Sequence, residues 1–178
     1  MSRYVKFAQK EHSLGKRVAA LLPAGVVFLF LLPYLILVVG PNLDKRMGLV
    51  GFYSGAANII IGTLMIVVGG TFGLWSIYMQ MDQGRGTPLP VMPTQELLVR
   101  GPFLYCRNPM TLGTILAYLG LGIMVGTVAG VAFVLILAGL LLFYLKRFEE
   151  RELEERFGQA YRDYKRQVPF IIPRLPKR

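Results

Sequence analysis

Three long uncharged stretches restrict this chain to a membrane fold. Residues 18–43, 48–81 and 108–145 contain no Asp, Glu, Lys, Arg or His, and they are 26, 34 and 38 residues long. A helix needs about 20 apolar residues to cross the hydrocarbon layer, so each stretch is long enough for at least one span. With 54% hydrophobic residues in a chain of 178, the sequence predicts an all-α integral membrane helical bundle.

The third stretch is predicted to form a helical hairpin. A single helix of 38 residues would be about 57 Å long, nearly twice the hydrocarbon thickness of about 30 Å. Gly120, Gly122 and Gly126 interrupt the stretch. We therefore expect two helices joined by a tight turn, which gives four transmembrane helices in total.

The distribution of basic residues predicts the topology. In a four-span arrangement 18 of the 20 Lys and Arg residues fall on one face, and only Lys45 and Arg46 fall on the other. Because cytoplasmic loops carry an excess of Lys and Arg, both termini are expected in the cytoplasm, with the chain in the inner membrane if the cell is prokaryotic. The net charge of +10 then indicates attraction to anionic lipids, and no nucleic-acid-binding motif accompanies it.

These features predict a single domain over residues 1–178. Its parts are a basic interfacial arm (1–17), two spans (18–81), a cytoplasmic loop (82–107), the hairpin (108–145) and a cytoplasmic helix with a tail (146–178). The first span, Val18–Gly40, contains Pro23 and Pro33 and is expected to be kinked and to remain uncleaved. The Gly- and Pro-rich loop either covers a ligand or only connects two spans.

Polar residues at the two ends of the hairpin predict a binding site. Asn108 before Pro109 is a helix-start signal, in which the Asn side chain accepts backbone N–H groups. The partly positive start of that helix, with Arg107 beside it, suits a carboxylate or phosphate. Glu149 and Glu150, where the hairpin leaves the membrane, suit ammonium or hydroxyl donors. The combination favours a zwitterionic ligand.

The C-terminal segment continues the last span as a helix that ends at Phe157-Gly158. An i, i+4 stripe places Glu149 on an apolar face, and its members are Leu145, Glu149, Leu153 and Phe157. An aromatic and proline-bearing tail follows, and it either folds back over the site or anchors the chain at the interface. Its marker residues are Tyr161, Tyr164, Pro169 and Pro173.

Metal chemistry and a cysteine nucleophile are not expected. His12 is the only imidazole and Cys106 the only thiol, so the chain offers no Cys/His cluster for zinc. Cys106 has no His partner to activate it and is interpreted as structural.

Residues from about 84 to 173 resemble the superfamily of isoprenylcysteine carboxyl methyltransferases and phospholipid methyltransferases. The family pattern Arg-His-Pro-x-Tyr-x-Gly is similar to the segment from Arg107 to Gly113, and the pattern Glu-Glu-x-x-Leu-x-x-x-Phe-Gly-x-x-Tyr-x-x-Tyr is similar to the segment from Glu149 to Tyr164. Asn108 replaces the usual His and Thr111 the usual Tyr. The variant Asn-Pro-Met resembles the phosphatidylethanolamine N-methyltransferase branch more closely.

The resemblance implies a membrane methyltransferase that uses S-adenosylmethionine and no metal. It implies catalytic roles for Arg107, Glu149 and Glu150. The implied cofactor-binding residues are Tyr105, Arg107, Asn108, Pro109, Gly113, Glu149, Glu150 and Tyr161.

The implied methyl acceptor is a lipid or lipidated molecule, first a phospholipid headgroup amine and second an isoprenylcysteine-type carboxylate. A sterol-reductase-like lipid reductase and a non-catalytic membrane scaffold are the alternatives from other classes. Binding of S-adenosylmethionine separates the methyltransferases from both.

Overall fold

The computed structural model describes residues 14–51, 55–85, 87 and 93–175. These residues form helices and connecting segments, and no strand occurs among them. The predicted arm at residues 1–17 lies mostly outside the described residues. The N-terminal part is a continuous helical rod, here called the N-terminal rod. It consists of α2 (Leu14–Val26), η1 (Val27–Leu31), α3 (Leu32–Tyr34), η2 (Leu35–Val39) and α4 (Gly40–Met47).

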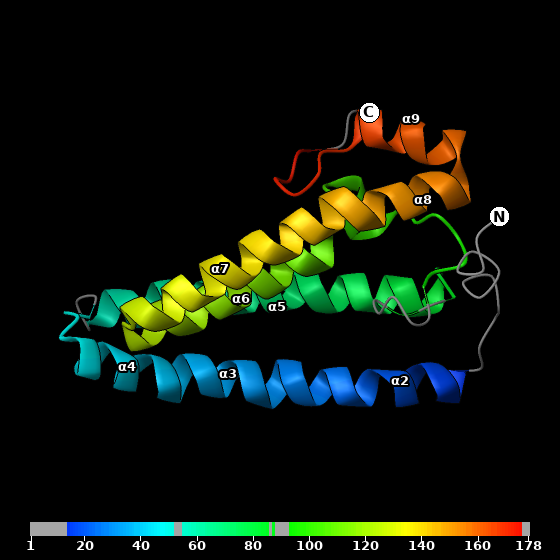
Figure 1. Cartoon of the computed structure of the whole chain (residues 1–178). Coiled ribbons are helices and arrows are strands. Elements are labelled where there is room, and N and C mark those ends of the chain that lie inside the picture. Colours follow the sequence, from blue (N-terminus) through cyan, green and yellow to red (C-terminus); the bar gives the residue numbers. More distant parts are fainter. Residues whose placement is uncertain (1–13, 52–54, 86, 88–92, 176–178) are drawn as a thin grey trace.

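The remaining helices follow in order along the chain (Figure 1). They are α5 (Ala56–Asp82), η3 (Gly101–Leu104), α6 (Pro109–Val125), α7 (Val128–Tyr144), η4 (Leu145–Glu149), α8 (Glu150–Phe157) and α9 (Gln159–Gln167). Three helical stretches are long and apolar enough to cross a membrane, Gly15–Met47, Ala56–Asp82 and Val128–Phe157. The 17-residue α6 is also apolar and is about 26 Å long at about 1.5 Å per residue. The predicted helical membrane bundle is confirmed.

The predicted hairpin is formed by α6 and α7. Gly126 ends α6 with a φ of 74°, in the left-handed region that favours glycine. Thr127 then starts α7, because its hydroxyl oxygen accepts a hydrogen bond from the Gly130 N–H at 3.1 Å. The turn is short because one residue closes the first helix and the next caps the second.

Helices α5 and α6 pack backbone to backbone through glycines. A Cβ on Gly62 would lie 2.6 Å from the carbonyl oxygen of Gly120, and a Cβ on Gly69 would lie 2.5 Å from that of Gly113. Any side chain there would force the helices apart, so the small residues permit this close approach. Gly113 is therefore a packing residue, placed against α5.

Hydrogen bonds tie the N-terminal rod to the rest of the bundle at both ends, and η2 packs against α6 and α7 between them. At one end the buried carboxylate of Asp44 accepts hydrogen bonds from the Thr127 hydroxyl at 2.7 Å and from the N–H groups of Val128 and Ala129 at 3.0 and 2.8 Å. A carboxylate at the start of α7 also interacts favourably with the helix dipole. At the other end the Arg17 guanidinium donates to the Met81 carbonyl at 2.8 Å.

The rod is longer than predicted, since the helix continues through Pro41 to Met47. Pro41 occupies one of the first two positions of α4, where a missing N–H costs little. Pro33 lies between the two π-helical segments η1 and η2, so local rewinding absorbs the proline without ending the helix.

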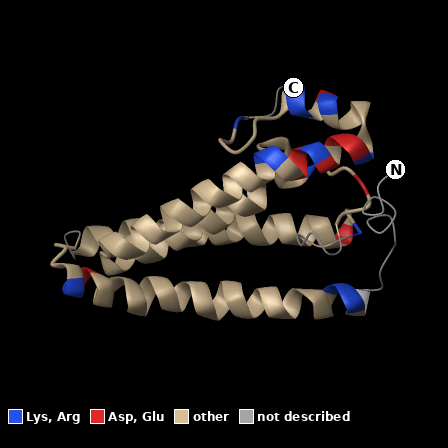
Figure 2. Cartoon of the chain, in the orientation of Figure 1, with Lys and Arg blue, Asp and Glu red and all other residues tan. Residues whose placement is uncertain are grey.

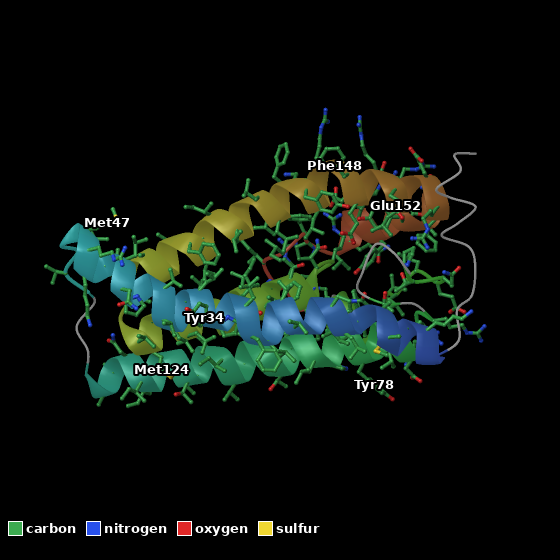
Figure 3. All side chains as sticks on the ribbon, turned by 60° about the horizontal axis from the view of Figure 1, so that its bottom comes forward. Tyr34, Met47, Tyr78, Met124, Phe148 and Glu152 are labelled. Carbon is green, nitrogen blue, oxygen red and sulfur yellow. The ribbon has the colours of Figure 1, made fainter. Side chains whose placement is uncertain are left out.

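Charged residues gather at the two ends of the bundle and leave an uncharged middle (Figure 2). Met47 and Met124 lie at one end, whereas Tyr78 and Glu152 lie at the other (Figure 3). The start of α2, the end of α5 and both C-terminal helices share the second end (Figure 1). The fold thus presents an apolar belt with polar residues on either side of it.

Candidate functional site

A cavity of ≈ 280 Å³ lies where the α6–α7 hairpin meets the C-terminal helices. Both halves of the sequence pattern contribute to its lining, namely Arg107, Asn108 and Pro109 at the start of α6 and Glu149 and Glu150 at the start of α8. The rest of the lining comes from these two helices and from other elements, and consists of Phe28, Gln80, Thr94, Glu96, Leu97, Leu98, Phe103, Met110, Thr111, Thr114, Leu141, Tyr144, Leu145, Leu153, Phe157, Tyr161 and Tyr164. Segments from across the chain therefore converge on one site.

A buried ion pair joins the two halves of the site. The Arg107 guanidinium contacts the Glu150 carboxylate, and the two side chains are only 9% and 8% exposed. Lys165 from α9 reaches the second oxygen of Glu150 at 2.8 Å and Glu154 at 2.8 Å. These two acceptors raise the pKa of Lys165 by stabilising its charged form. Glu150 is thus occupied by two cations from the protein itself.

Arg107 is held in place by further hydrogen bonds. Its Nε donates to the Val168 carbonyl at 3.0 Å, and its Nη1 also lies 3.3 Å from the Tyr161 hydroxyl. The ring of Phe170 lies 5.5 Å from the guanidinium carbon, a cation–π distance. These contacts use Nε and Nη1 and leave one guanidinium nitrogen of Arg107, Nη2, without a hydrogen bond among the described residues.

The C-terminal tail is paired with the segment that precedes α6. The Arg107 N–H donates to the Pro169 carbonyl at 2.9 Å, and the Arg174 N–H donates to the Tyr105 carbonyl at 3.0 Å. Of the two alternatives for the tail, these contacts favour the one in which it folds back, here against the segment that leads into α6. Residues Gln159–Gln167 form a helix that the sequence analysis did not predict.

Helix α9 folds back because of its own apolar spacing. Tyr161, Tyr164 and Val168 recur at i, i+3 and i+7 and are buried against Met79 and Phe103. The Tyr164 hydroxyl donates to the Phe103 carbonyl at 2.7 Å, and burial raises its pKa. This pattern of three apolar residues among many charged ones is the only local signal for the helix, and the sequence-based prediction did not use it.

Asn108 does not cap α6 as predicted. Its side chain makes no capping hydrogen bond, and its Nδ2 donates instead to the Phe170 carbonyl at 3.0 Å. The tail carbonyl attracts the amide group away from the helix start. Like those at the start of any helix, the N–H groups of Met110 and Thr111 have no partner within the helix, and the Asn108 side chain does not cap them. The Leu112 N–H is the first to bond, to the Asn108 carbonyl at 3.0 Å.

Glu149 differs from its neighbour in having no hydrogen-bond or ion-pair partner among the described residues. It lines the cavity together with Leu145, Leu153 and Phe157, the apolar stripe that the sequence predicted. The π-helical turn η4 (Leu145–Glu149) sits immediately before Glu150 and directs both acids to one side of the chain. Of these two adjacent acids, Glu149 is therefore the one without an ion-pair partner among the described residues.

Two residues predicted to bind a cofactor lie outside the cavity lining. The Tyr105 ring packs edge-on against Phe72 with 6.4 Å between ring centroids, and Gly113 contacts α5 as described above. Sequence reasoning missed Phe28 and Gln80, which are far along the chain from the motif. It also did not single out Thr94, Glu96, Leu97 and Leu98 within the nearby loop, because they carry no local signal. The described part of the loop contributes these four residues to the cavity lining, and a loop that covers a bound ligand stays a prediction.

Cys106 is fully buried, at 0% exposure. Burial raises the pKa of its thiol to about 11, and this outweighs the opposing effect of a backbone hydrogen bond from Asn108. The thiol is therefore protonated at neutral pH and acts as a packing group. Within the described part of the chain no group of three or more His, Cys, Asp or Glu side chains could hold a metal ion.

Residues 57–160, more than half of the chain, match the family described as phospholipid methyltransferase. The chain belongs to this family. The match includes both Arg107 and Glu150, so the residues of the buried ion pair fall within the family region.

Similar proteins include the methanethiol S-methyltransferase of Crocosphaera subtropica, which is 29% identical over 77% of this chain and 52% of its own length. The methanethiol S-methyltransferase of Mycobacterium tuberculosis is 32% identical over 68% of this chain and 46% of its own length. The chain thus spans about half the length of these relatives. No solved structure shows a significant match.

Proposed function

We propose that this protein is a membrane methyltransferase that uses S-adenosylmethionine and acts on an acceptor held in or at the bilayer. The observation that carries the proposal is one cavity lined both by the start of α6 and by Glu149, an acid with no partner among the described residues, inside a region that matches a methyltransferase family. The methyl donor is zwitterionic at its amino-acid end, which requires groups of both signs in a partly desolvated site.

The residues of the cavity fit such a donor. Its carboxylate is matched by the free N–H groups of Met110 and Thr111 at the positive end of α6, with the remaining Nη2 of Arg107 nearby. Its ammonium group is matched by Glu149. Glu150 is a poorer partner because Arg107 and Lys165 already occupy its carboxylate.

When bound, S-adenosylmethionine supplies a methyl group attached to a positively charged sulfur: the acceptor lone pair bonds to the methyl carbon, the carbon–sulfur bond breaks, and the sulfur leaves as a neutral thioether. The protein then has to align the acceptor and exclude water. Leu145, Leu153 and Phe157 provide apolar walls for this purpose. An amine or thiol acceptor must also lose a proton, and the exposed Glu96 on the cavity lining is a second acid that can take it.

We infer a phospholipid headgroup amine as the first candidate acceptor, because the site lies where apolar helices reach the polar end of the bundle and because the family is named for phospholipids. A small apolar thiol is the second candidate, favoured by the names of the similar proteins. Both enter more readily from the membrane than from water, since both partition into apolar surroundings.

Incubation of purified protein with S-adenosylmethionine labelled at the methyl group tests the proposal. One reaction contains phosphatidylethanolamine vesicles and the other contains methanethiol. Label in the lipid supports the amine, and label in dimethyl sulfide supports the thiol. Label in a prenylcysteine ester, tested in a third reaction, would instead favour the carboxylate acceptor. Absence of S-adenosylhomocysteine binding by calorimetry would refute the methyltransferase proposal itself.

A further inference from the structure

A second cavity, of ≈ 200 Å³, lies within the apolar belt between the N-terminal rod and the α6–α7 hairpin. Its lining shares Phe28, Thr114 and Leu141 with the first cavity. We refer to this second cavity as the apolar groove. Thr114 follows Met110 and Thr111 by four and three residues, so all three share a face of α6. The groove therefore adjoins the place where the donor would bind, with Phe28, Thr114 and Leu141 at the boundary.

One hydrogen bond crosses the groove, and the position of Pro33 explains why it forms. The Tyr118 hydroxyl on α6 donates to the Phe28 carbonyl on the N-terminal rod at 2.5 Å. In the π-helical segment the Leu32 N–H donates to the Val27 carbonyl, so the next donor along the rod would be residue 33. That residue is Pro33 and has no N–H. The Phe28 carbonyl is thus left without a helical partner, and Tyr118 satisfies it.

The chemistry of the groove restricts what can occupy it. Its only hydroxyl-bearing side chains are Thr114 and Tyr118, and the Tyr118 hydroxyl is already engaged with Phe28. A polar ligand would lose its hydrogen bonds to water there without replacement. The volume of ≈ 200 Å³ lies below the roughly 300 Å³ at the small end of drug-sized pockets. The occupant must be slender and made of hydrocarbon.

We propose that the groove binds one apolar chain of the methyl acceptor and that Tyr118 determines how long a chain it takes. The reactive end of the acceptor then points through the neck at Phe28, Thr114 and Leu141 into the first cavity. Tyr118 acts as a specificity-determining residue, because its bond to Phe28 holds the rod against α6 and so limits the space available to a chain and with it the chain length. This inference rests on the proposed function for the identity of the occupant.

Filling the groove provides the test. Ala138 on α7 is buried, at 8% exposure, and lines the groove but not the first cavity, so Ala138→Phe places a ring in the groove. The matched control is Ala132→Phe, on an exposed position of the same helix. The probe is a sixteen-carbon primary alkylamine that carries a diazirine in its chain, and labelled residues are identified by mass spectrometry after irradiation.

In the unmodified protein we expect the probe to label groove residues. Labelling should fall in Ala138→Phe, by about fourfold for each methylene that the ring displaces, and persist in Ala132→Phe. Tyr118→Phe keeps the ring but loses the bond, and it should shift the preferred chain length in a series of alkylamines from four to sixteen carbons. Calorimetry with S-adenosylhomocysteine should give the same affinity in all variants.

Equal labelling of the groove in Ala138→Phe and Ala132→Phe would overturn the proposal, as would labelling confined to lipid-facing positions in the unmodified protein. An unchanged chain-length series in Tyr118→Phe would remove the role of Tyr118. The two proposals are tested by different measurements. Absence of S-adenosylhomocysteine binding in calorimetry would refute the proposed function, whereas the pattern of photolabelling reports on the groove alone.

Discussion

Replacing Glu150 with Gln is expected to destabilise the fold, whereas the same change at Glu149 is expected to weaken binding of S-adenosylhomocysteine. The two acids are adjacent in sequence and line one cavity. Glu150 is paired with Arg107 and Lys165, and Glu149 has no hydrogen-bond or ion-pair partner in the described part of the chain. The prediction therefore assigns stability to one residue and ligand binding to its neighbour.

The magnitude for Glu150→Gln follows from the burial of the pair. Arg107 and Glu150 are 9% and 8% exposed, and removing one partner of a buried pair costs about 3–5 kcal/mol. Gln keeps an oxygen that can accept from Arg107, so we expect the lower end, about 3 kcal/mol. Lys165 is 39% exposed, and its contact adds at most about 1 kcal/mol. The melting temperature should fall by about 6–12 °C.

Glu149→Gln removes no internal partner, so its effect on stability should stay within about 0.5 kcal/mol. The loss of a charge-assisted hydrogen bond to the ligand ammonium should reduce affinity by about 10- to 150-fold. Melting curves in detergent and calorimetry with S-adenosylhomocysteine give the two quantities. Glu155→Gln makes the same chemical change at an exposed position of α8 and should alter neither.

Two outcomes would contradict this assignment. If Glu149→Gln lowered the melting temperature as much as Glu150→Gln, the carboxylate of Glu149 would have an internal partner that the structure does not contain. If Glu149→Gln bound S-adenosylhomocysteine with full affinity, Glu149 would not contact the ligand. The double variant Arg107→Met with Glu150→Leu should recover much of the stability lost in Glu150→Gln, because no buried charge then remains unpaired.

Three other predictions concern single features. Cys106 should resist N-ethylmaleimide at pH 8 in the folded protein, because it is fully buried and its pKa of about 11 keeps it protonated; rapid modification seen by mass spectrometry would contradict this. Asn108→Ala should cost about 1 kcal/mol and speed hydrogen exchange at the Arg174 amide, since the bond to Phe170 is lost; unchanged exchange would show that Asn108 does not hold the tail. Reporter fusions after residues 90 and 178 should both give cytoplasmic signals, and fusions after 44 and 124 the opposite; opposite signals from 90 and 178 would refute the topology.

Much of the fold was predictable because a bilayer imposes strong local rules. Uncharged stretches that exceed the membrane thickness must be helices, and a stretch near twice that thickness must turn back. The end of α8 at Gly158 and the hairpin turn at Gly126 also follow from local residue preferences. The helical form of α9 was missed because nine mostly charged residues give little helical signal without the surface on which Tyr161 and Tyr164 pack.

The candidate site was predictable only in part. The sequence by itself determined which charged groups stand where the hairpin enters and leaves the membrane, since a membrane helix can hold Arg107, Glu149 and Glu150 only near its ends. The tertiary structure alone decided how they pair. Glu150 pairs with Arg107 and Lys165, the Asn108 side chain bonds to the tail and not to its own helix, and Glu149 has no partner among the residues that the structure describes. The Arg107–Glu150 and Asn108–Phe170 contacts join residues 43 and 62 positions apart, and local spacing does not contain that information.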